Sequence, residues 1–267
     1  FFKERKVPAI YGIDTRKLAK TIREYGSMNG RLTVKKPPYG PEELGQIRSF
    51  RITSAVESVT PAGCHLIKTK GKADYRVVLW DFGAKENILR ELTKRGCDVY
   101  DATASTTADE ILALDPDGIM LSNGPGNPED NARVIEELKK LAVAKRPIFG
   151  ICLGHQLLAI ARGAKTGKMK YGHRGANQPV KDLETGRIYI SSQNHGYEVL
   201  RESLPAGAEE TFINVNDGTC EGITYRDIPA FTVQFHPEAC AGPKDTEELF
   251  GRFIKMMEKY KEEASCR

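Results

Sequence analysis

Long apolar runs are missing from this chain of 267 residues. A membrane-spanning helix needs about 20 consecutive apolar residues, and no stretch of the sequence approaches that length. The opening residues, Phe-Phe-Lys-Glu-Arg-Lys, are too short and too charged for a signal peptide. We therefore expect a cytoplasmic protein that has no membrane partner.

Paired cysteines and a strong net charge are missing as well. The six cysteines lie far apart without a Cys-x-x-Cys pair, which argues against a zinc site and against a disulfide framework. The net charge of +4 is mild for this length, and no aromatic residues interleave with the lysines to stack on bases. We expect no metal, no nucleic-acid partner and a reducing compartment.

Alternating apolar patterns are present from residue 75 onward. The run 76–81 is almost continuously apolar, which is typical of a strand covered on both faces. Amphipathic segments follow it in alternation with further short apolar runs. This β-α-β-α order predicts an α/β domain with a mostly parallel central sheet and helices on both faces. The helices are expected at 85–95, 107–114, 131–144 and 245–260, and further strands at 97–100, 118–122, 147–151, 186–192, 211–214, 221–225 and 231–235.

The residues before this domain have a different character. Asp14-Thr15 is a helix-cap pattern, a helix is expected up to Gly26, and residues 31–34 could add a short strand. A second short helix is expected at 42–50. We divide the chain into an N-terminal remnant at 1–58, an irregular linker at 59–74 and the main domain at 75–267.

Cys152 lies in the stretch around which the chain is organised. Gly150 and Gly154 flank it two residues away on each side, between a predicted strand and a predicted helix. This spacing fits a sharp strand-to-helix turn that lifts a nucleophile above the sheet edge. The N-terminus of the helix would favour the thiolate. The alternative is that Cys152 is a small buried apolar side chain, as most lone cysteines are.

A possible base for this thiol follows the last predicted strand, in the sequence His236-Pro-Glu238. Thiol catalysis needs an imidazole that takes and returns a proton, and a third group that orients the ring. Glu238 is suited to that orienting role. Without the cysteine turn, a surface histidine beside an exposed glutamate would be the better interpretation.

Two polar segments could complete a site. The Gly-Pro-Gly loop at 124–126 is either a plain turn or a source of backbone N–H groups for an oxyanion, together with Leu153 directly after the cysteine. The run 191–197 suits recognition of a small polar substrate. We interpret His195 as structural, because His236 has the better carboxylate partner, and His155 as structural, because it would point away from the turn at the cysteine.

Together these motifs resemble class I triad glutamine amidotransferases, whose fold is flavodoxin-like. Within that class the chain is similar to the small, glutaminase subunits of carbamoyl-phosphate synthases. The class-level motifs are Gly150-Ile-Cys-Leu-Gly-His-Gln156, the loop at 124–126 and His236-Pro-Glu238. The narrower match is carried by Gly12-Ile-Asp-Thr-Arg16, His173-Arg-Gly-Ala-Asn-Gln-Pro179, Ser192-Gln-Asn-His-Gly-Tyr197 and His236-Pro-Glu-Ala-Cys-Ala-Gly-Pro243.

The resemblance implies that Cys152 forms a γ-glutamyl thioester with L-glutamine, that His236 moves the protons and that Glu238 orients His236. Ammonia would pass through a tunnel to a large subunit that consumes ATP, with Mg²⁺, and bicarbonate, for arginine and pyrimidine synthesis. No cofactor is expected in this chain. The residues implied to bind glutamine or its oxyanion are Gly124, Gly126, Leu153, Gln156, Asn194, Gly196 and Tyr197, the last being more often Phe.

One departure and two alternatives remain at this point. Family members carry a further N-terminal domain with a serine that touches glutamine, and only its tail is recognised here, so the chain is either truncated or dependent on a missing piece. The same triad could serve anthranilate or guanylate synthesis, although the segment at 12–16 favours the narrower match. The chain could also be a structural or regulatory subunit that only docks onto a synthetase.

Overall fold

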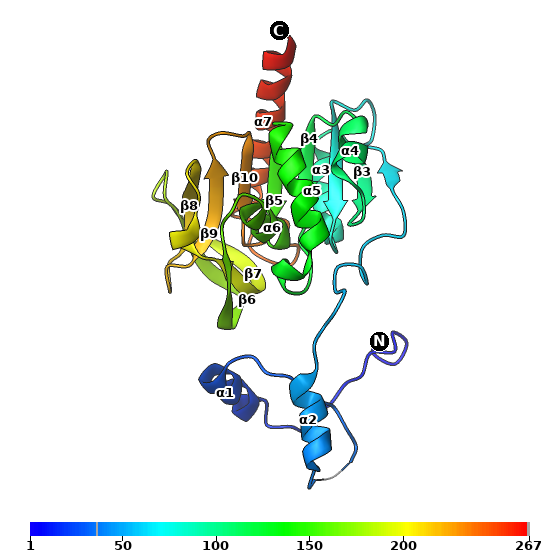
Figure 1. The fold of residues 1–267 in the computed structure, drawn as a ribbon, viewed down its shortest axis with the longest axis vertical. Helices are drawn as coiled ribbons and strands as arrows, with labels where there is room; N and C mark the ends of the chain where they lie inside the picture. The colour runs from blue at the N-terminus through cyan, green and yellow to red at the C-terminus, as the bar shows by residue number, and fades with distance from the viewer. Residues whose placement is uncertain (36, 266–267) are drawn as a thin grey trace. The chain divides into compact units, whose positions relative to one another are not determined.

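The computed structural model describes residues 1–35 and 37–265. The chain divides into two compact units, one of Phe1–Ile52 and one that begins at Thr53. The first unit contains α1 (Thr15–Tyr25) and α2 (Pro41–Ser49), and the second contains the sheet and the other helices (Figure 1). The finer division at 58 and 74 stays a prediction.

In the first unit the cap pattern is confirmed. The side chain of Asp14 accepts a hydrogen bond from the Lys17 N–H at 2.8 Å, which satisfies one of the free donors of the first turn. Gly26 follows the helix with a φ of 88°, a value that glycine adopts without strain. Residues 31–34, where a strand was considered, are irregular, because the described part of this unit offers no strand to pair with.

Ten strands of the described chain form one sheet in the second unit, in the order β1-β3-β2-β4-β5-β10-β9-β7-β6-β8. Their bounds are β1 (His65–Ile67), β2 (Tyr75–Asp81), β3 (Cys97–Thr103), β4 (Gly118–Leu121), β5 (Ile148–Ile151), β6 (Thr166–Asp182), β7 (Ile188–Val199), β8 (Ala208–Asn214), β9 (Cys220–Tyr225) and β10 (Ala230–Val233).

Five neighbouring strands, β3, β2, β4, β5 and β10, are parallel. Numbered along the chain, their order is 2-1-3-4-5, which is the flavodoxin-like arrangement. Ligands in such sheets bind beyond the carboxyl ends of the strands. The α/β class is therefore confirmed, and the candidate residues at the ends of β4, β5 and β10 fall on the edge where a site is expected.

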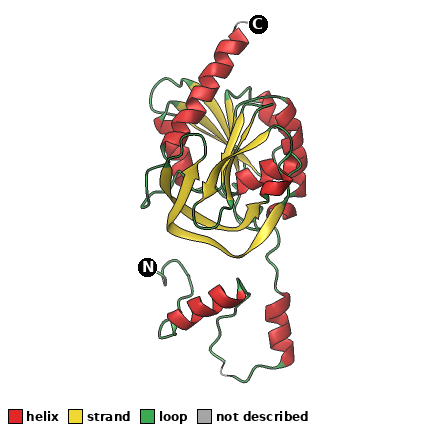
Figure 2. Ribbon diagram, turned by 90° about the vertical axis from the view of Figure 1, so that its left-hand side faces the viewer, coloured by secondary structure: helices red, strands yellow, loops and turns green. Residues whose placement is uncertain are grey.

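Helices cover both faces of the parallel strands (Figure 2). Residues of α4, α5 and α6 pack in one apolar cluster with Val78 and Trp80, while α3 and α7 pack in a second cluster with Val77 and Leu79. Side chains alternate between these clusters along β2, as the period of two in a strand requires. The bounds are α3 (Glu86–Lys94), α4 (Ala108–Ala113), α5 (Ala132–Val143), α6 (Leu153–Ala161) and α7 (Glu248–Ser265), with short 3₁₀ turns η1 (Pro128–Asp130) and η2 (Arg201–Ser203).

The antiparallel strands are more extensive than the sequence indicated. β6 was not predicted, and it pairs with β7 in a long hairpin that has two register shifts. Its polar, glycine-containing sequence lacks the alternation that marks a half-buried strand. β1 lies within the predicted linker and pairs antiparallel with β3. None of the helices among the described residues combines the length and the hydrophobicity of a membrane span.

Four phenylalanines hold the sheet against α7. The Phe149 ring on β5 stacks on Phe231 with ring centroids 4.4 Å apart, and it contacts Phe250 and Phe253 of α7 at 5.6 and 5.9 Å. All four side chains are almost fully buried. Because β5 leads directly into Cys152, this cluster fixes the strand on which the candidate nucleophile depends.

Replacing Phe149 with alanine should lower the free energy of unfolding by about 3–5 kcal/mol, because the cavity lies where three rings meet. Urea-induced unfolding of both proteins measures the difference. Val143→Ala, at a position that is 81% exposed, is the control and should change stability by less than about 0.5 kcal/mol. Equal effects of the two substitutions would contradict this account of the core.

Candidate active site

Cys152 occupies a strained turn between β5 and α6. Its φ of 53° and ψ of −101° lie where non-glycine residues are rare. A Cβ at Gly150 would lie 2.8 Å from Thr232 Cγ2, and one at Gly154 would lie 2.5 Å from the Leu121 carbonyl oxygen. Only glycine fits at these two positions, so the predicted sharp strand-to-helix turn is present.

Pairing of β5 with β10 brings His236 to the elbow. The two strands are parallel neighbours, and the Cys152 N–H donates to the Val233 carbonyl at 2.8 Å. His236 follows three residues after Val233, and its own N–H donates to the Ser192 carbonyl at 2.9 Å. The Cys152 sulfur lies close enough to the His236 imidazole to influence its pKa.

Glu238 lies behind the imidazole. Its Oε1 is 2.8 Å from His236 Nδ1, and both side chains are at most 3% exposed. Burial alone disfavours the imidazolium, but the negative charge of Cys152 and hydrogen bonds to Cys152 and Glu238 raise the pKa of His236 to about 9. The arrangement therefore favours the charged imidazolium of His236 at neutral pH.

Lys85 is a fourth charged group that the sequence did not reveal. Its Nζ lies 3.2 Å from Glu238 Oε1, and the residue stands directly before α3, after the end of β2. Burial opposes ionisation of Glu238, yet His236 and then Lys85 hold the pKa of this carboxyl below its usual value. Asn87, also on α3, donates to the Glu238 carbonyl oxygen at 2.6 Å. The sequence signal that could have identified Lys85 was a basic residue shortly after the end of β2, at the sheet edge where a site is expected.

The Gly-Pro-Gly loop lies against the elbow. The Gly154 N–H donates to the Ser122 carbonyl at 3.0 Å. A Cβ at Gly124 would lie 2.6 Å from Leu153 Cδ2. Gly126 has a φ of +95°, so the loop turns sharply next to the N-terminus of α6, where the first N–H groups lack intrahelical partners. The loop also lines a polar cavity of about 60 Å³.

The other residues predicted to bind substrate gather on β7 and α6. Gln156 Nε2 donates to the Tyr197 carbonyl at 2.9 Å and to Gln234 Oε1 at 2.8 Å, so this buried amide ties the two elements together. The Asn194 side chain accepts a hydrogen bond from Arg174. Gly196 lies between Asn194 and Tyr197 on β7. The same strand contains Ser192, whose carbonyl accepts the hydrogen bond from the His236 N–H.

Two further histidines are buried, and their pKa values lie well below the range that suits a catalytic base. His155 is fully buried, its Nδ1 lies 2.8 Å from Thr232 Oγ1, and burial lowers its pKa to about 3. Burial likewise lowers the pKa of His195 to about 3. Both rings are neutral at physiological pH, in agreement with their interpretation as structural residues.

Comparisons with known proteins identify the family of this chain. The family described as "Glutamine amidotransferase class-I" matches residues 78–256, and "Carbamoyl-phosphate synthase small chain, CPSase domain" matches residues 1–32. A carbamoyl phosphate synthase small chain of Bacillus cereus is 50% identical over 98% of this chain and 71% of its own length. The chain belongs to the carbamoyl phosphate synthase small chain family of class-I glutamine amidotransferases.

A second small chain and one solved structure are also similar to this chain. The small chain of Symbiobacterium thermophilum is 49% identical over 95% of this chain and 71% of its own. A crystal structure from Thermoplasma acidophilum, of a protein assigned to GMP synthase, superposes with a TM-score of 0.64 at 23% identity, over 72% of this chain and 98% of that one. This last likeness concerns the class-I amidotransferase fold alone.

Acid should destabilise the protein through His155. Unfolded histidine titrates near about 6.5 and folded His155 at about 3, so between these values the unfolded state binds more protons. Stability is therefore complete above pH ~6.5 and is lost as the pH falls, by up to about 1.4 kcal/mol per unit. Urea titrations from pH ~6.5 to ~5 measure this slope, which should be shallower in His155→Gln. Parallel slopes would contradict it.

Proposed function

We propose that this chain hydrolyses L-glutamine to glutamate and ammonia through a thioester on Cys152, and supplies the ammonia to a large synthetase subunit that makes carbamoyl phosphate. The observation that carries the proposal is that His236 lies beside Cys152 where β10 and β5 end, with Glu238 Oε1 2.8 Å from the ring. The family of the chain supports carbamoyl phosphate as the product of the complex. So does the name of a relative that is 50% identical, a carbamoyl phosphate synthase small chain.

The first half-reaction releases ammonia. The Cys152 thiolate attacks the side-chain carbonyl carbon of glutamine, and a tetrahedral intermediate forms with its negative charge on oxygen. The N–H groups of Leu153 and Gly126 are proposed to stabilise that oxygen, a contribution typically worth ~10²–10³ in rate per donor. His236 gives its proton to the departing nitrogen, the C–N bond breaks, and the γ-glutamyl thioester remains.

The second half-reaction regenerates the thiolate. Neutral His236 takes a proton from water, the hydroxide attacks the thioester carbonyl, and the C–S bond breaks to release glutamate. Glu238 stabilises the imidazolium each time it forms, and Lys85 keeps Glu238 ionised in a buried position. Each step uses only residues of this chain and water.

Substrate recognition and partner chemistry complete the proposal. We infer that Gly124, Gln156, Asn194, Gly196 and Tyr197 line the glutamine pocket, and that the Tyr197 ring stacks on the substrate. ATP, Mg²⁺ and bicarbonate would be used by the large subunit, which receives ammonia through a tunnel, for arginine and pyrimidine synthesis. No cofactor of this chain takes part in the proposed hydrolysis.

Cys152→Ser should lower glutamate release by roughly 10³-fold or more, because a serine hydroxyl is a far weaker nucleophile at neutral pH. Release is measured with the large subunit present, and acid-quenched samples are examined by mass spectrometry for a γ-glutamyl adduct on the peptide that contains residue 152. Cys64→Ser, at an exposed cysteine, is the matched control and should retain full activity. Equal activity of wild-type and Cys152→Ser would reject the thioester mechanism.

Glu238→Gln should lower kcat by about 10²–10⁴-fold with little change in KM, because the orienting charge is lost and the side chain keeps its size. Loss of this carboxylate should also lower the pKa of His236, which it helps to raise. The alkaline limb of the kcat–pH profile should therefore move to lower pH. Glu86→Gln, at an exposed glutamate, is the control, and an unmoved limb in Glu238→Gln would refute the assigned role.

A further inference from the structure

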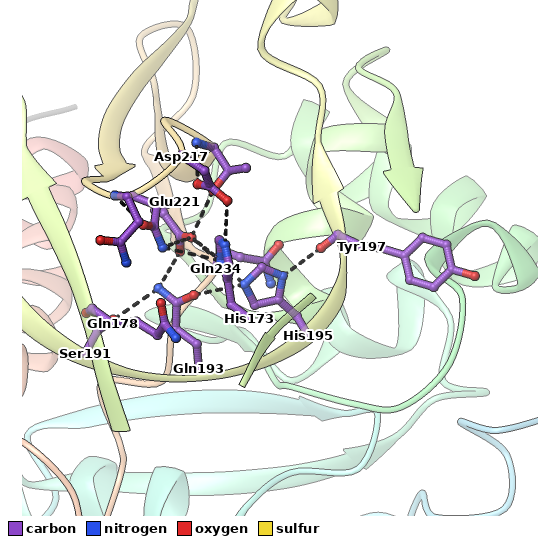
Figure 3. Close-up of polar contacts among 12 residues, drawn as sticks. His173, Gln178, Ser191, Gln193, His195, Tyr197, Asp217, Glu221 and Gln234 are labelled. Atoms are coloured by element: carbon purple, nitrogen blue, oxygen red, sulfur yellow. Dashed lines mark hydrogen bonds and ion pairs between the residues drawn. The ribbon is translucent and has the colours of Figure 1, made fainter. Parts of the chain in front are cut away.

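Two histidines and a glutamate meet inside the antiparallel part of the sheet, outside the triad (Figure 3). His173 comes from β6, His195 from β7 and Glu221 from β9. Their side chains are at most 8% exposed. Three residues that come from three strands and carry potential ligand atoms therefore converge in a buried position.

The spacing of their donor atoms suits a metal ion. Glu221 Oε1 lies 3.1 Å from His173 Nδ1 and 3.9 Å from His195 Nε2, and the three ligand atoms all lie within 4.8 Å of one another. Tetrahedral zinc with bonds of about 2.0–2.1 Å places its ligands roughly 3.4 Å apart. Two of the observed separations lie on either side of this value, and the third pair of atoms is no more than 4.8 Å apart.

The outer contacts of both imidazoles fix the nitrogens that face the centre. His173 Nε2 lies 2.8 Å from Asp217 Oδ2, and His195 Nδ1 lies 2.8 Å from the Tyr197 carbonyl oxygen. Each contact needs an N–H, so in the neutral rings the other nitrogen presents its lone pair. Metal-binding histidines are oriented in this way by a carboxylate or a carbonyl.

The contact between His195 and Gln193 in the cluster is unfavourable without a cation. His195 Nε2 lies 3.1 Å from Gln193 Oε1, while Gln193 Nε2 donates to Glu221 Oε2 at 3.0 Å. With its proton on Nδ1, His195 brings a lone pair against an acceptor oxygen in a buried place, which is costly. Turning the Gln193 amide only moves the conflict to Glu221.

A proton is the competing explanation. Burial opposes protonation, but hydrogen bonds to Glu221 and Asp217 raise the pKa of His173 to about 9, so an imidazolium can bridge these two carboxylates. That proton satisfies His173 but leaves the contact between His195 and Gln193. A divalent cation instead faces both ring lone pairs and balances the two carboxylate charges.

We propose that His173, His195 and Glu221 bind one divalent cation of the zinc type, which cross-links β6, β7 and β9. Imidazole and carboxylate donors suit zinc among the common divalent ions. Asp217, whose side chain is 44% exposed, connects the site with solvent. The expectation of no metal came from cysteine spacing, and this donor set contains no cysteine.

The test uses the full chain with Cys152→Ser, which removes a competing thiolate. After chelator treatment and dialysis, Zn²⁺ is titrated by calorimetry, the retained metal is counted by elemental analysis, and X-ray absorption identifies its ligands. One equivalent bound by nitrogen and oxygen is expected. Glu221→Gln in the same background should weaken binding by at least about 100-fold, since loss of a ligand exceeds the effect of its outer partners.

Two further variants keep the test decisive. Asp217→Asn, at a half-exposed position where folding is less at risk, should weaken Zn²⁺ binding about 10–100-fold. His65→Gln removes an exposed histidine outside the cluster and should leave binding unchanged. No stoichiometric Zn²⁺, sulfur ligands, or equal binding by Glu221→Gln and its parent would overturn the proposal and leave a proton-bridged network. Zinc binding is measured without glutamine, so its failure is separable from failure of the proposed hydrolysis.

Discussion

The parallel pairing of β5 with β10 is the constraint on which the candidate active site depends. Cys152 ends one strand and His236 follows the other, so a register in which Val233 pairs with Ile151 brings sulfur and imidazole to one edge. The hydrogen bond from the Cys152 N–H to the Val233 carbonyl fixes this register at the end of the paired strands. A slip of one residue would turn the neighbouring side chains to the opposite face.

Charge inside this edge is arranged as a chain of alternating sign. Beside Cys152, the His236 imidazolium, the Glu238 carboxylate and the Lys85 ammonium follow one another from the sheet edge to solvent. An isolated buried charge is expensive, whereas a paired one is tolerated. Lys85, which is partly exposed, connects this buried series with water and keeps the carboxylate ionised.

Much of this could be predicted from the sequence, for identifiable physical reasons. Apolar runs covered on both faces marked β2, β4 and β5, and the glycines around Cys152 marked the elbow because no larger residue fits there. Asp14 and Gly26 marked the ends of α1. These features are local, and local sterics determine them.

What sequence reasoning missed depends on contacts between distant segments. β6 is polar and glycine-containing, and it becomes a strand only because β7 pairs with it. Lys85 lies near the start of this domain's sequence and contacts Glu238, which lies near its end. The cluster of His173, His195 and Glu221 is formed by residues from three strands. The spacing of His173, His195 and Glu221 along the chain follows no pattern that could have indicated their proximity.

The tight packing around residue 152 has a consequence for how such a protein changes over generations. The backbone there is set by Gly150, Gly154 and Gly124, each pressed against a neighbour, and not by the sulfur. A descendant that exchanged the sulfur for another small group would keep the shape of its turn. The fold can therefore be inherited without the reactive sulfur, and a relative that has lost the sulfur would keep the same backbone structure.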